Sequence, residues 1–415
     1  MSVVTAVVAM SIFLIGLCAL EHYTRKSRLP YVCWVLLSGL VYGLLLRGPL
    51  PNLPPMQLLL SPDIVLYIFL PLLIFDSSRK LGVKSSEEVA LPSLLLATFG
   101  LIVNMFVMAG IIYGIAHIFK VAIGWKDILL LSGIMSATDP VAVGTVFQVF
   151  PIPKKLRMLI EGESLLNDGT TVIIFMLLSE IVMDGKHFRL LPAIGMFSMA
   201  ILGAVAIGVV FGAVGSWLLR RWNALNDRFV APLMPVLLSY LAFALAQARF
   251  EISGVIAVLS ATLTFHVVFN RLRPDEAPSQ KDKERYIALW DFLGDMANVI
   301  LFFVLGIEMG IQTGGLAHWV VVSGIVALVV ARSVTIYGFG FLVRSTSMRI
   351  PLSWQHVMNI GGLRGALCAA LILMIPRDYQ FRGVFLYIAL SLSLFTLIVN
   401  PLLMRSYLKK ADLST

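Results

Sequence analysis

Charged residues are scarce in this sequence. Asp, Glu, Lys and Arg make up 13% of the 415 residues, whereas hydrophobic residues make up 59%, and the mean hydropathy is +0.91. A soluble globular domain carries about 25% charged and about 45–50% apolar residues. A soluble core cannot accommodate this much apolar surface, but a lipid bilayer can. The composition therefore excludes an ordinary soluble domain and predicts a polytopic, all-α integral membrane protein.

Cysteine and histidine are also rare. The cysteines Cys18, Cys33 and Cys368 lie in apolar segments and form neither a disulfide framework nor a metal-ligand spacing. The six histidines are scattered, without an HExxH pattern. We therefore expect no cofactor and no resident metal. The excess of 32 basic over 23 acidic residues does not indicate a nucleic-acid partner, because the basic residues gather in short loops, as membrane topology requires.

Apolar stretches recur along the whole chain. A membrane span needs about 20 largely apolar residues. Thirteen candidate segments meet or approach this length: Val3–Leu20, Tyr31–Leu46, Ile64–Phe75, Leu91–Phe119, Ile128–Phe150, Leu156–Val182, Leu191–Leu219, Val230–Ala246, Ile252–Phe269, Ile287–Ile311, Ala317–Val343, Trp354–Ile375 and Val384–Leu403. We interpret residues 1–415 as a single membrane unit.

The basic residues predict the topology. The loops and adjoining segment ends that follow odd-numbered segments, together with the C-terminal tail, hold 22 Lys and Arg, whereas those that follow even-numbered segments hold 8. Since cytoplasmic loops carry the excess of positive charge, the N-terminus is expected outside and the C-terminus in the cytoplasm. The expected location is the cell inner (plasma) membrane.

The fifth segment contains an acidic residue next to a helix breaker. Asp139 lies near the middle of the segment and is followed by Pro140, which has no amide hydrogen and disfavours helix at the preceding residue. The helix should therefore break around Thr138 and Asp139. The carbonyl oxygens that a break releases, together with a carboxylate, suit a small hard cation.

The sixth segment carries four polar side chains within six residues. Ser164 and Asp168 are four residues apart and share a helix face, and Glu163 and Asn167 form the adjoining stripe. One alternative is a polar stripe that is solvated at the membrane surface. Because all four lie in mid-segment beside the acidic residue of the fifth segment, a buried polar site is the preferred interpretation.

The twelfth segment contains a second expected interruption. Three glycines within Gly361–Gly365 weaken a helix, although close helix packing would also explain them. Segments five and twelve hold corresponding places in the two halves of the chain. Paired interruptions of this kind point to a transporter binding site at the interface of inverted repeats.

Charge counting limits the number of exchangeable acids. The mid-membrane charges are Asp139, Glu163, Asp168, Arg332 and Arg364. Because buried charges must be paired, two acids are expected to be balanced by the arginines and one to alternate between a proton and a cation. Other acids are weaker candidates. Asp76 is interpreted as a helix cap, Asp291 and Asp295 as helix N-terminal charges or an entrance funnel, and Glu308 as solvated.

These motifs resemble those of the cation/proton antiporter family, in the branch of bacterial NhaP-like sodium/proton antiporters and animal and plant sodium/proton exchangers. The resemblance rests on Thr138-Asp139-Pro140, Gly162-Glu163-Ser164-Leu165-Leu166-Asn167-Asp168, Gly362-Leu363-Arg364-Gly365, the run from Ser253 to Val258, and Arg332. It covers essentially the whole chain. It implies an inverted-repeat antiporter fold of about 13 transmembrane helices, with segments five and twelve unwound where they cross.

The resemblance also implies an arrangement of domains and a mechanism. A core domain of approximately residues 91–183 and 316–408 would move against a dimer domain of approximately 1–90 and 190–313. The protein would be a homodimer with elevator-type alternating access. It would exchange sodium or lithium for protons and serve pH homeostasis. One-for-one exchange is expected because Asn167 has no proton to lose, which leaves Asp168 as the exchanging acid.

The site residues follow from the same resemblance. Asp168 would be the central ion- and proton-binding acid. The transported sodium ion would be coordinated by Asp168, Asp139, Ser164, Glu163 and the Thr138 carbonyl. Asn167, Arg332 and Arg364 would support the site. Arg332 would pair with Glu163 and Arg364 would stabilise the crossing, unless the two arginines exchange roles.

Other functions fit the sequence less well. A potassium/proton antiporter of the same fold is the main alternative, since both ions use oxygen ligands and differ in the cavity size they need. An ion channel is a remote alternative, because no TVGYG-like filter is present. The protein is not expected to be an enzyme. Gly162-Glu163-Ser164 imitates the start of a protease motif, but Leu165 follows and no histidine accompanies it.

Overall fold

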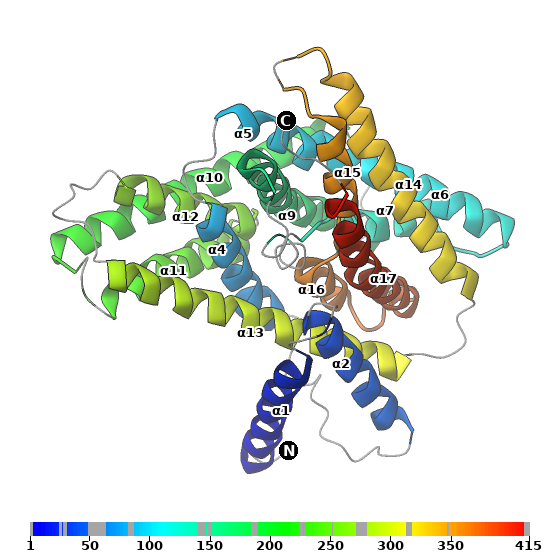
Figure 1. The fold of residues 1–415 in the computed structure, drawn as a ribbon, viewed down its shortest axis with the longest axis horizontal. Coiled ribbons are helices and arrows are strands. Elements are labelled where there is room, and N and C mark those ends of the chain that lie inside the picture. Colours follow the sequence, from blue (N-terminus) through cyan, green and yellow to red (C-terminus); the bar gives the residue numbers. More distant parts are fainter. Residues whose placement is uncertain are drawn as a thin grey trace. The chain divides into compact units, whose positions relative to one another are not determined.

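The structure is a computed structural model that describes most of the chain. The described residues are 3–24, 27, 31–48, 64–81, 87–139, 147, 152–183, 190–224, 227, 229–250, 252–270, 280–312, 318–346 and 348–410. All regular elements formed by these residues are helices (Figure 1). This agrees with the all-α fold predicted from the composition.

The chain divides into two compact units. Unit 1 comprises Met1–Pro62, Ile102–Leu156 and Asn298–Thr415, and unit 2 comprises Asp63–Leu101 and Arg157–Ala297. Apart from residues at the boundaries, the helices of unit 1 are α1 (Val3–Thr24), α2 (Tyr31–Arg47), α6 (Leu101–Ile118), α7 (Trp125–Ile134), the C-terminal part of α13 (Gln280–Gln312), α14 (His318–Leu342), α15 (Leu352–Ile360), α16 (Ala366–Met374) and α17 (Arg382–Leu408).

Unit 2 contains the remaining helices and three short π-helical turns. They are η2 (Val65–Phe69), α4 (Leu70–Leu81), α5 (Glu87–Leu95), η3 (Leu96–Gly100), α9 (Lys154–Met183), α10 (Leu190–Arg221), α11 (Val230–Ala244), η4 (Leu245–Arg249), α12 (Gly254–Asn270) and the N-terminal part of α13. Each π-helical turn adjoins an α-helix of the same segment.

Paired glycines bring α2 and α13 together in unit 1. Gly39 and Gly43 of α2 face Gly306 and Gly310 of α13, and both pairs have the four-residue spacing of a GxxxG motif. A Cβ added at Gly306 would lie 2.7 Å from the backbone nitrogen of Leu40. In lipid, where apolar side chains gain little by association, such close backbone contact is what holds two helices together.

Alanine substitution at Gly306 is therefore expected to destabilise the protein. The added methyl group meets backbone, which cannot rotate away, and overpacking of this kind costs about 1–3 kcal/mol. Gly110 of α6 is the matched control, because no atom lies within 4 Å of a Cβ built there. Thermal unfolding in detergent measures both variants. Equal melting temperatures for the two would contradict the close contact.

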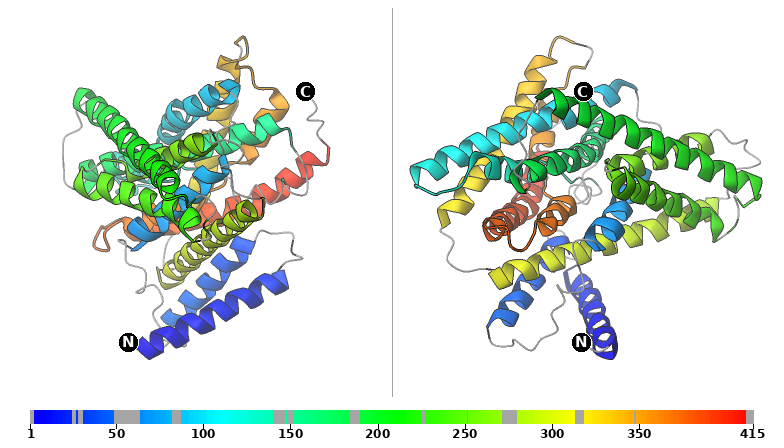
Figure 2. Two further views of the ribbon diagram at one scale, coloured as in Figure 1. Left: turned by 90° about the vertical axis from the view of Figure 1, so that its left-hand side faces the viewer. Right: turned by 180° about the vertical axis from the view of Figure 1, so that it is seen from behind.

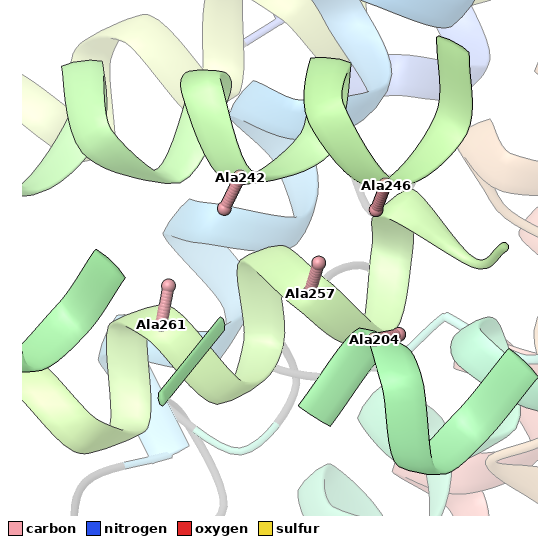
Figure 3. Close-up of a cluster of buried hydrophobic side chains, with 5 residues drawn as sticks. All are labelled: Ala204, Ala242, Ala246, Ala257 and Ala261. Atoms are coloured by element: carbon pink, nitrogen blue, oxygen red, sulfur yellow. The ribbon is translucent and has the colours of Figure 1, made fainter. Parts of the chain in front are cut away.

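Small side chains also form the centre of unit 2. The helices α10, α11 and α12 lie side by side in both views of Figure 2. Their buried cluster, shown in Figure 3, consists of Ala204, Ala242, Ala246, Ala257 and Ala261. A Cβ added at Gly208 of α10 would clash with the Ala257 carbonyl of α12. The two helices therefore depend on small residues for their close approach.

Seven helices in the described part of the chain are long and apolar enough to cross a membrane. They are Val89–Ile118, Lys154–Met183, Ser198–Arg221, Val230–Arg249, Glu284–Ile311, Val320–Leu342 and Arg382–Leu408. Shorter apolar helices cover Ser11–Thr24, Tyr31–Arg47 and Gly254–Val268. The segments interrupted at mid-length fall below this length criterion. Thirteen spans and an inverted repeat therefore stay predictions.

The two compact units are not the two predicted domains. Unit 1 joins α1, α2 and part of α13, which we assigned to the dimer domain, with α14 to α17 of the expected core domain. The units describe which parts of one conformation are compact. They do not test which helices move together during transport, so the division into core and dimer domains stays a prediction.

Candidate ion-binding site

The first expected interruption is present in unit 1. The helix α7 ends at Ile134, its C-cap is Met135, and residues 137–139 have no helical structure. The break thus begins one turn before Asp139. Pro140, which we gave as the cause of the break, lies outside the described residues.

The second expected interruption separates α15 from α16. Its five residues, Gly361–Gly365, are non-helical, and two of their backbone N–H groups have partners that a helix would not supply. The Leu363 N–H donates to the Gly361 carbonyl at 2.8 Å, and the Arg364 N–H donates to the Thr396 hydroxyl of α17 at 3.2 Å. These bonds replace those that the helix would have supplied.

The two interruptions meet within unit 1. The backbone N–H of Asp139 donates a 2.9 Å hydrogen bond to the carbonyl of Leu363. A second hydrogen bond joins the start of α7 to the residues that follow α16. The hydroxyl of Tyr379, just after α16, donates to the carboxylate of Asp127, at the start of α7, at 2.5 Å. Burial, and then this bond, raise the pKa of Tyr379 above its ordinary value.

Two glycines of the second interruption make room for charged side chains. A Cβ at Gly362 would lie 2.8 Å from Nε of Arg332, and a Cβ at Gly365 would clash with the side chain of Asp139. Neither glycine has a left-handed backbone. The glycines are therefore needed for space at the crossing, which agrees with the close packing that the sequence analysis gave as the alternative to a weakened helix.

Both arginines of the charge count are buried in unit 1. Arg332 donates from Nη2 to the Met358 carbonyl at 3.1 Å, in the last turn of α15. A positive charge at a helix C-terminus is favourable. The Arg364 side chain is 0% exposed and stands in the second interruption itself. The pairing of Glu163 with one of these arginines stays a prediction.

The polar stripe of the sixth segment lies on α9, an uninterrupted helix of 30 residues in unit 2. Glu163, Ser164 and Asn167 are each 2% exposed. The hydroxyl of Thr171, one turn further along, donates to the Asn167 side-chain oxygen at 3.0 Å. Three of the four stripe residues are therefore buried, which contradicts the alternative of a polar stripe solvated at a membrane surface.

The acids differ in their accessibility. Asp139 in unit 1 and Asp168 in unit 2 are partly exposed, whereas Glu163 is buried. An acid that exchanges ions must be reached from solution, whereas an acid with a structural role need not be. The difference agrees with the roles that the resemblance implies for Asp168 and Glu163, although it does not test them.

The run from Ser253 to Val258 forms the first turn of α12 in unit 2. The Ser253 hydroxyl accepts a 3.3 Å hydrogen bond from the Ile256 N–H and so caps the helix. A Cβ at Gly169 of α9 would lie 3.1 Å from the Ile256 side chain. This motif therefore packs against α9 at Gly169, the residue that follows Asp168 in the sequence.

Two acids outside the stripe are paired in a way that the sequence did not predict. Nη2 of Arg79 lies 2.6 Å from Oδ1 of Asp76 and 2.7 Å from Oδ1 of Asp291. The interpretation of Asp76 as only a helix cap was wrong. The interpretation of Asp291 as a charge in the first turn was also wrong, because α13 begins at Gln280, well before it. Asp295 is exposed.

Glu308 is buried, so the expectation that it is solvated was wrong. Its Oε2 lies 3.6 Å from Nη1 of Arg382, and Nε of Arg382 donates to the Ile375 carbonyl at 3.0 Å. Arg382 is the first residue of α17. A positive charge is unfavourable at a helix N-terminus, so the sequence did contain a signal that this arginine needs an acidic partner.

Taken together, the apolar helices, the two interrupted helices that meet at Asp139 and the buried carboxylate on α9 define the class of membrane ion transporters. Comparison with known families is more specific. The model of the family described as "Sodium/hydrogen exchanger, transmembrane" matches residues 9–410. The chain therefore belongs to the sodium/hydrogen exchanger family.

Curated relatives agree with this assignment, and a solved structure shares the fold. The chain is 28% identical to the Na(+)/H(+) antiporter NhaG of Bacillus atrophaeus, over 93% of this chain and 71% of the relative. It is 30% identical to the low-affinity Na(+)/H(+) antiporter NhaS1 of Synechocystis, over 85% of this chain and 66% of the relative. The fold matches that of the sodium proton antiporter MjNhaP1 of Methanocaldococcus jannaschii, with a TM-score of 0.79, 17% identity and 99% of both chains covered.

Proposed function

We propose that the protein exchanges one sodium or lithium ion for one proton across the cell inner membrane. The observation that carries the proposal is the meeting of two interrupted helices at Asp139, through its 2.9 Å bond to Leu363. Interrupted helices offer backbone carbonyls to a cation in the low-dielectric membrane, where no regular helix can. Family membership and the names of the relatives support the same activity.

Asp168 is the proposed exchanging acid. When it is ionised it binds the cation, and when it is protonated it releases the cation. The proposed ligands are those given by the resemblance: Asp168, Asp139, Ser164, Glu163 and the Thr138 carbonyl. All are oxygen donors, which suit an alkali cation. Asn167, Arg332 and Arg364 support these ligands without binding the ion.

The proposed movement is of the elevator type, within a homodimer whose N-termini face outward. The core domain, approximately residues 91–183 and 316–408, carries the site across the membrane, and the dimer domain, approximately residues 1–90 and 190–313, stays in place. The site has the same formal charge with a proton or with a cation bound. Moving the site across the membrane therefore takes the same electrical work with a proton bound as with a cation bound.

The activity itself is tested with purified protein in vesicles that contain a pH-sensitive dye. Addition of sodium to acid-loaded vesicles should drive protons out, and lithium should do the same. An equal response to potassium would favour a potassium/proton antiporter. Sodium flux without any proton movement would favour a channel.

One-to-one stoichiometry is a separate expected result. Asn167, beside Asp168, has no proton to exchange. Asp168 should therefore exchange one proton for one sodium ion in each cycle. At a fixed pH gradient, vesicles whose membrane potential is set with potassium and valinomycin should reach the same ratio of internal to external sodium at any potential. Exchange of two protons per sodium would instead move one charge, and about 100 mV would change that ratio about fiftyfold. A control without antiporter corrects for leak.

A further inference from the structure

The thiol of Cys368 binds the interrupted end of α7. Its Sγ donates to the Ile134 carbonyl at 3.2 Å and lies 3.6 Å from the Ala137 carbonyl, which shares the single thiol hydrogen. Cys368 belongs to α16 and is 1% exposed. All of these residues belong to unit 1.

These two carbonyls are among those that the break affects. In an uninterrupted helix the Ile134 carbonyl would accept from the N–H of Thr138, four residues on. Because α7 ends at Ile134, that helical bond is lost. A buried carbonyl without a partner is costly. The thiol therefore satisfies backbone groups immediately before Asp139.

Cys368 is also part of a continuous contact between α16 and the interrupted stretch. Leu363 accepts from the Asp139 N–H, and Gly365 leaves room for the Asp139 side chain. Cys368 lies three residues after Gly365, on the same face of the first helical turn. It contacts the carbonyls of Ile134 and Ala137, which lie closer to α7 in the sequence than Asp139 does. The chain from Ile134 to Asp139 is thus contacted at Ile134, Ala137 and Asp139 by the first turn of α16 and the residues just before it.

We propose that Cys368 is a positioning residue for cation binding. It fixes the backbone before Thr138 and Asp139, and so fixes the separation of the oxygen ligands that they supply. This inference rests on the proposed function. A cation needs several oxygens at set distances, whereas a proton needs one carboxylate and no set geometry. Loss of the thiol should therefore weaken sodium binding more than proton binding.

The test compares two buried cysteines in the same protein. Cys33 is 0% exposed and donates from its thiol at 3.2 Å to the Leu397 carbonyl of α17, which lacks its helical donor because residue 401 is a proline. Cys33→Ala is therefore a matched control for Cys368→Ala. Both variants lose a buried sulfur and one weak hydrogen bond, but only one loses it at the break.

Cys368→Ala is expected to raise the sodium concentration for half-maximal exchange about fivefold, the effect of losing about one hydrogen bond. The maximal rate and the pH profile at saturating sodium should change little. The ratio of lithium to sodium half-saturation should move toward one, because a looser site discriminates less by size. Cys368→Ser keeps a donor and should restore most of the sodium affinity. Cys33→Ala should leave all four quantities unchanged.

Equal half-saturation values in Cys368→Ala and the unsubstituted protein would overturn the proposal. So would equal rises in Cys368→Ala and Cys33→Ala, which would indicate general loosening of the helices. If Cys368→Ala does not insert, Cys368→Ser still decides, since a serine variant with unrestored affinity contradicts a donor role. Absence of sodium-driven proton flux in the unsubstituted protein would instead refute the proposed function itself.

Discussion

Replacement of Asp168 by Asn is expected to abolish cation/proton exchange while the protein still inserts into the membrane. Asn preserves the size and shape of the side chain, but it neither releases a proton near neutral pH nor neutralises a bound cation. If Asp168 is the exchanging acid, no residual coupled flux should be left above that of empty vesicles. Sodium-driven proton flux in vesicles measures the loss, and size-exclusion chromatography in detergent measures folding.

The control for this prediction lies on the same helix. Glu180 is a partly exposed acid three turns further along α9. Glu180→Gln removes a carboxylate from α9 without touching the polar stripe, and it should leave exchange near its normal rate. Asp168→Glu keeps a titratable group and should retain partial activity. Normal flux in Asp168→Asn would show that another acid, with Asp139 the first candidate, carries the exchange.

Much of the fold could be predicted because a membrane helix is surrounded by the uniformly apolar interior of the lipid bilayer. In a bilayer each backbone group must be satisfied within its own helix, so long apolar runs specify helices directly. The break before Asp139 was predicted from Pro140, because a proline removes a backbone hydrogen-bond donor at a known position. The buried stripe on α9 followed from helical periodicity, because Ser164 and Asp168 share a face whatever else surrounds them.

Long-range contacts could not be predicted in this way. Arg79 and Asp291 are 212 residues apart in the sequence, and Cys368 and Ile134 are 234 residues apart. A single sequence contains no signal that relates such positions. The glycines at the crossing illustrate the same limit. Their spacing indicated a weak helix or close packing, but the side chains that they make room for, Arg332 and Asp139, come from other segments.

The second large effect is expected at Gly365. Alanine at this position adds a methyl group where the side chain of Asp139 already lies, and the clash includes the Asp139 Cβ. The Asp139 backbone is bound to Leu363, so the side chain cannot move without shifting the crossing. Overpacking costs about 1–3 kcal/mol, and a displaced ligand should lower exchange by about tenfold or more. Flux in vesicles and thermal unfolding in detergent both report the change.

A double-mutant cycle separates this clash from a general effect on the helix. Asp139→Gly removes the Cβ and the carboxyl group that the new methyl group meets, so the stability cost of Gly365→Ala should largely disappear in that background. Exchange would stay absent in the double variant if Asp139 is a ligand, because only the packing is repaired. Gly338→Ala on α14 is the control, since nothing lies within 4 Å of a Cβ there. If Gly365→Ala costs the same stability with and without the Asp139 side chain, the close approach of α16 to the first interruption is wrong. The cation site would then have to be sought away from this crossing.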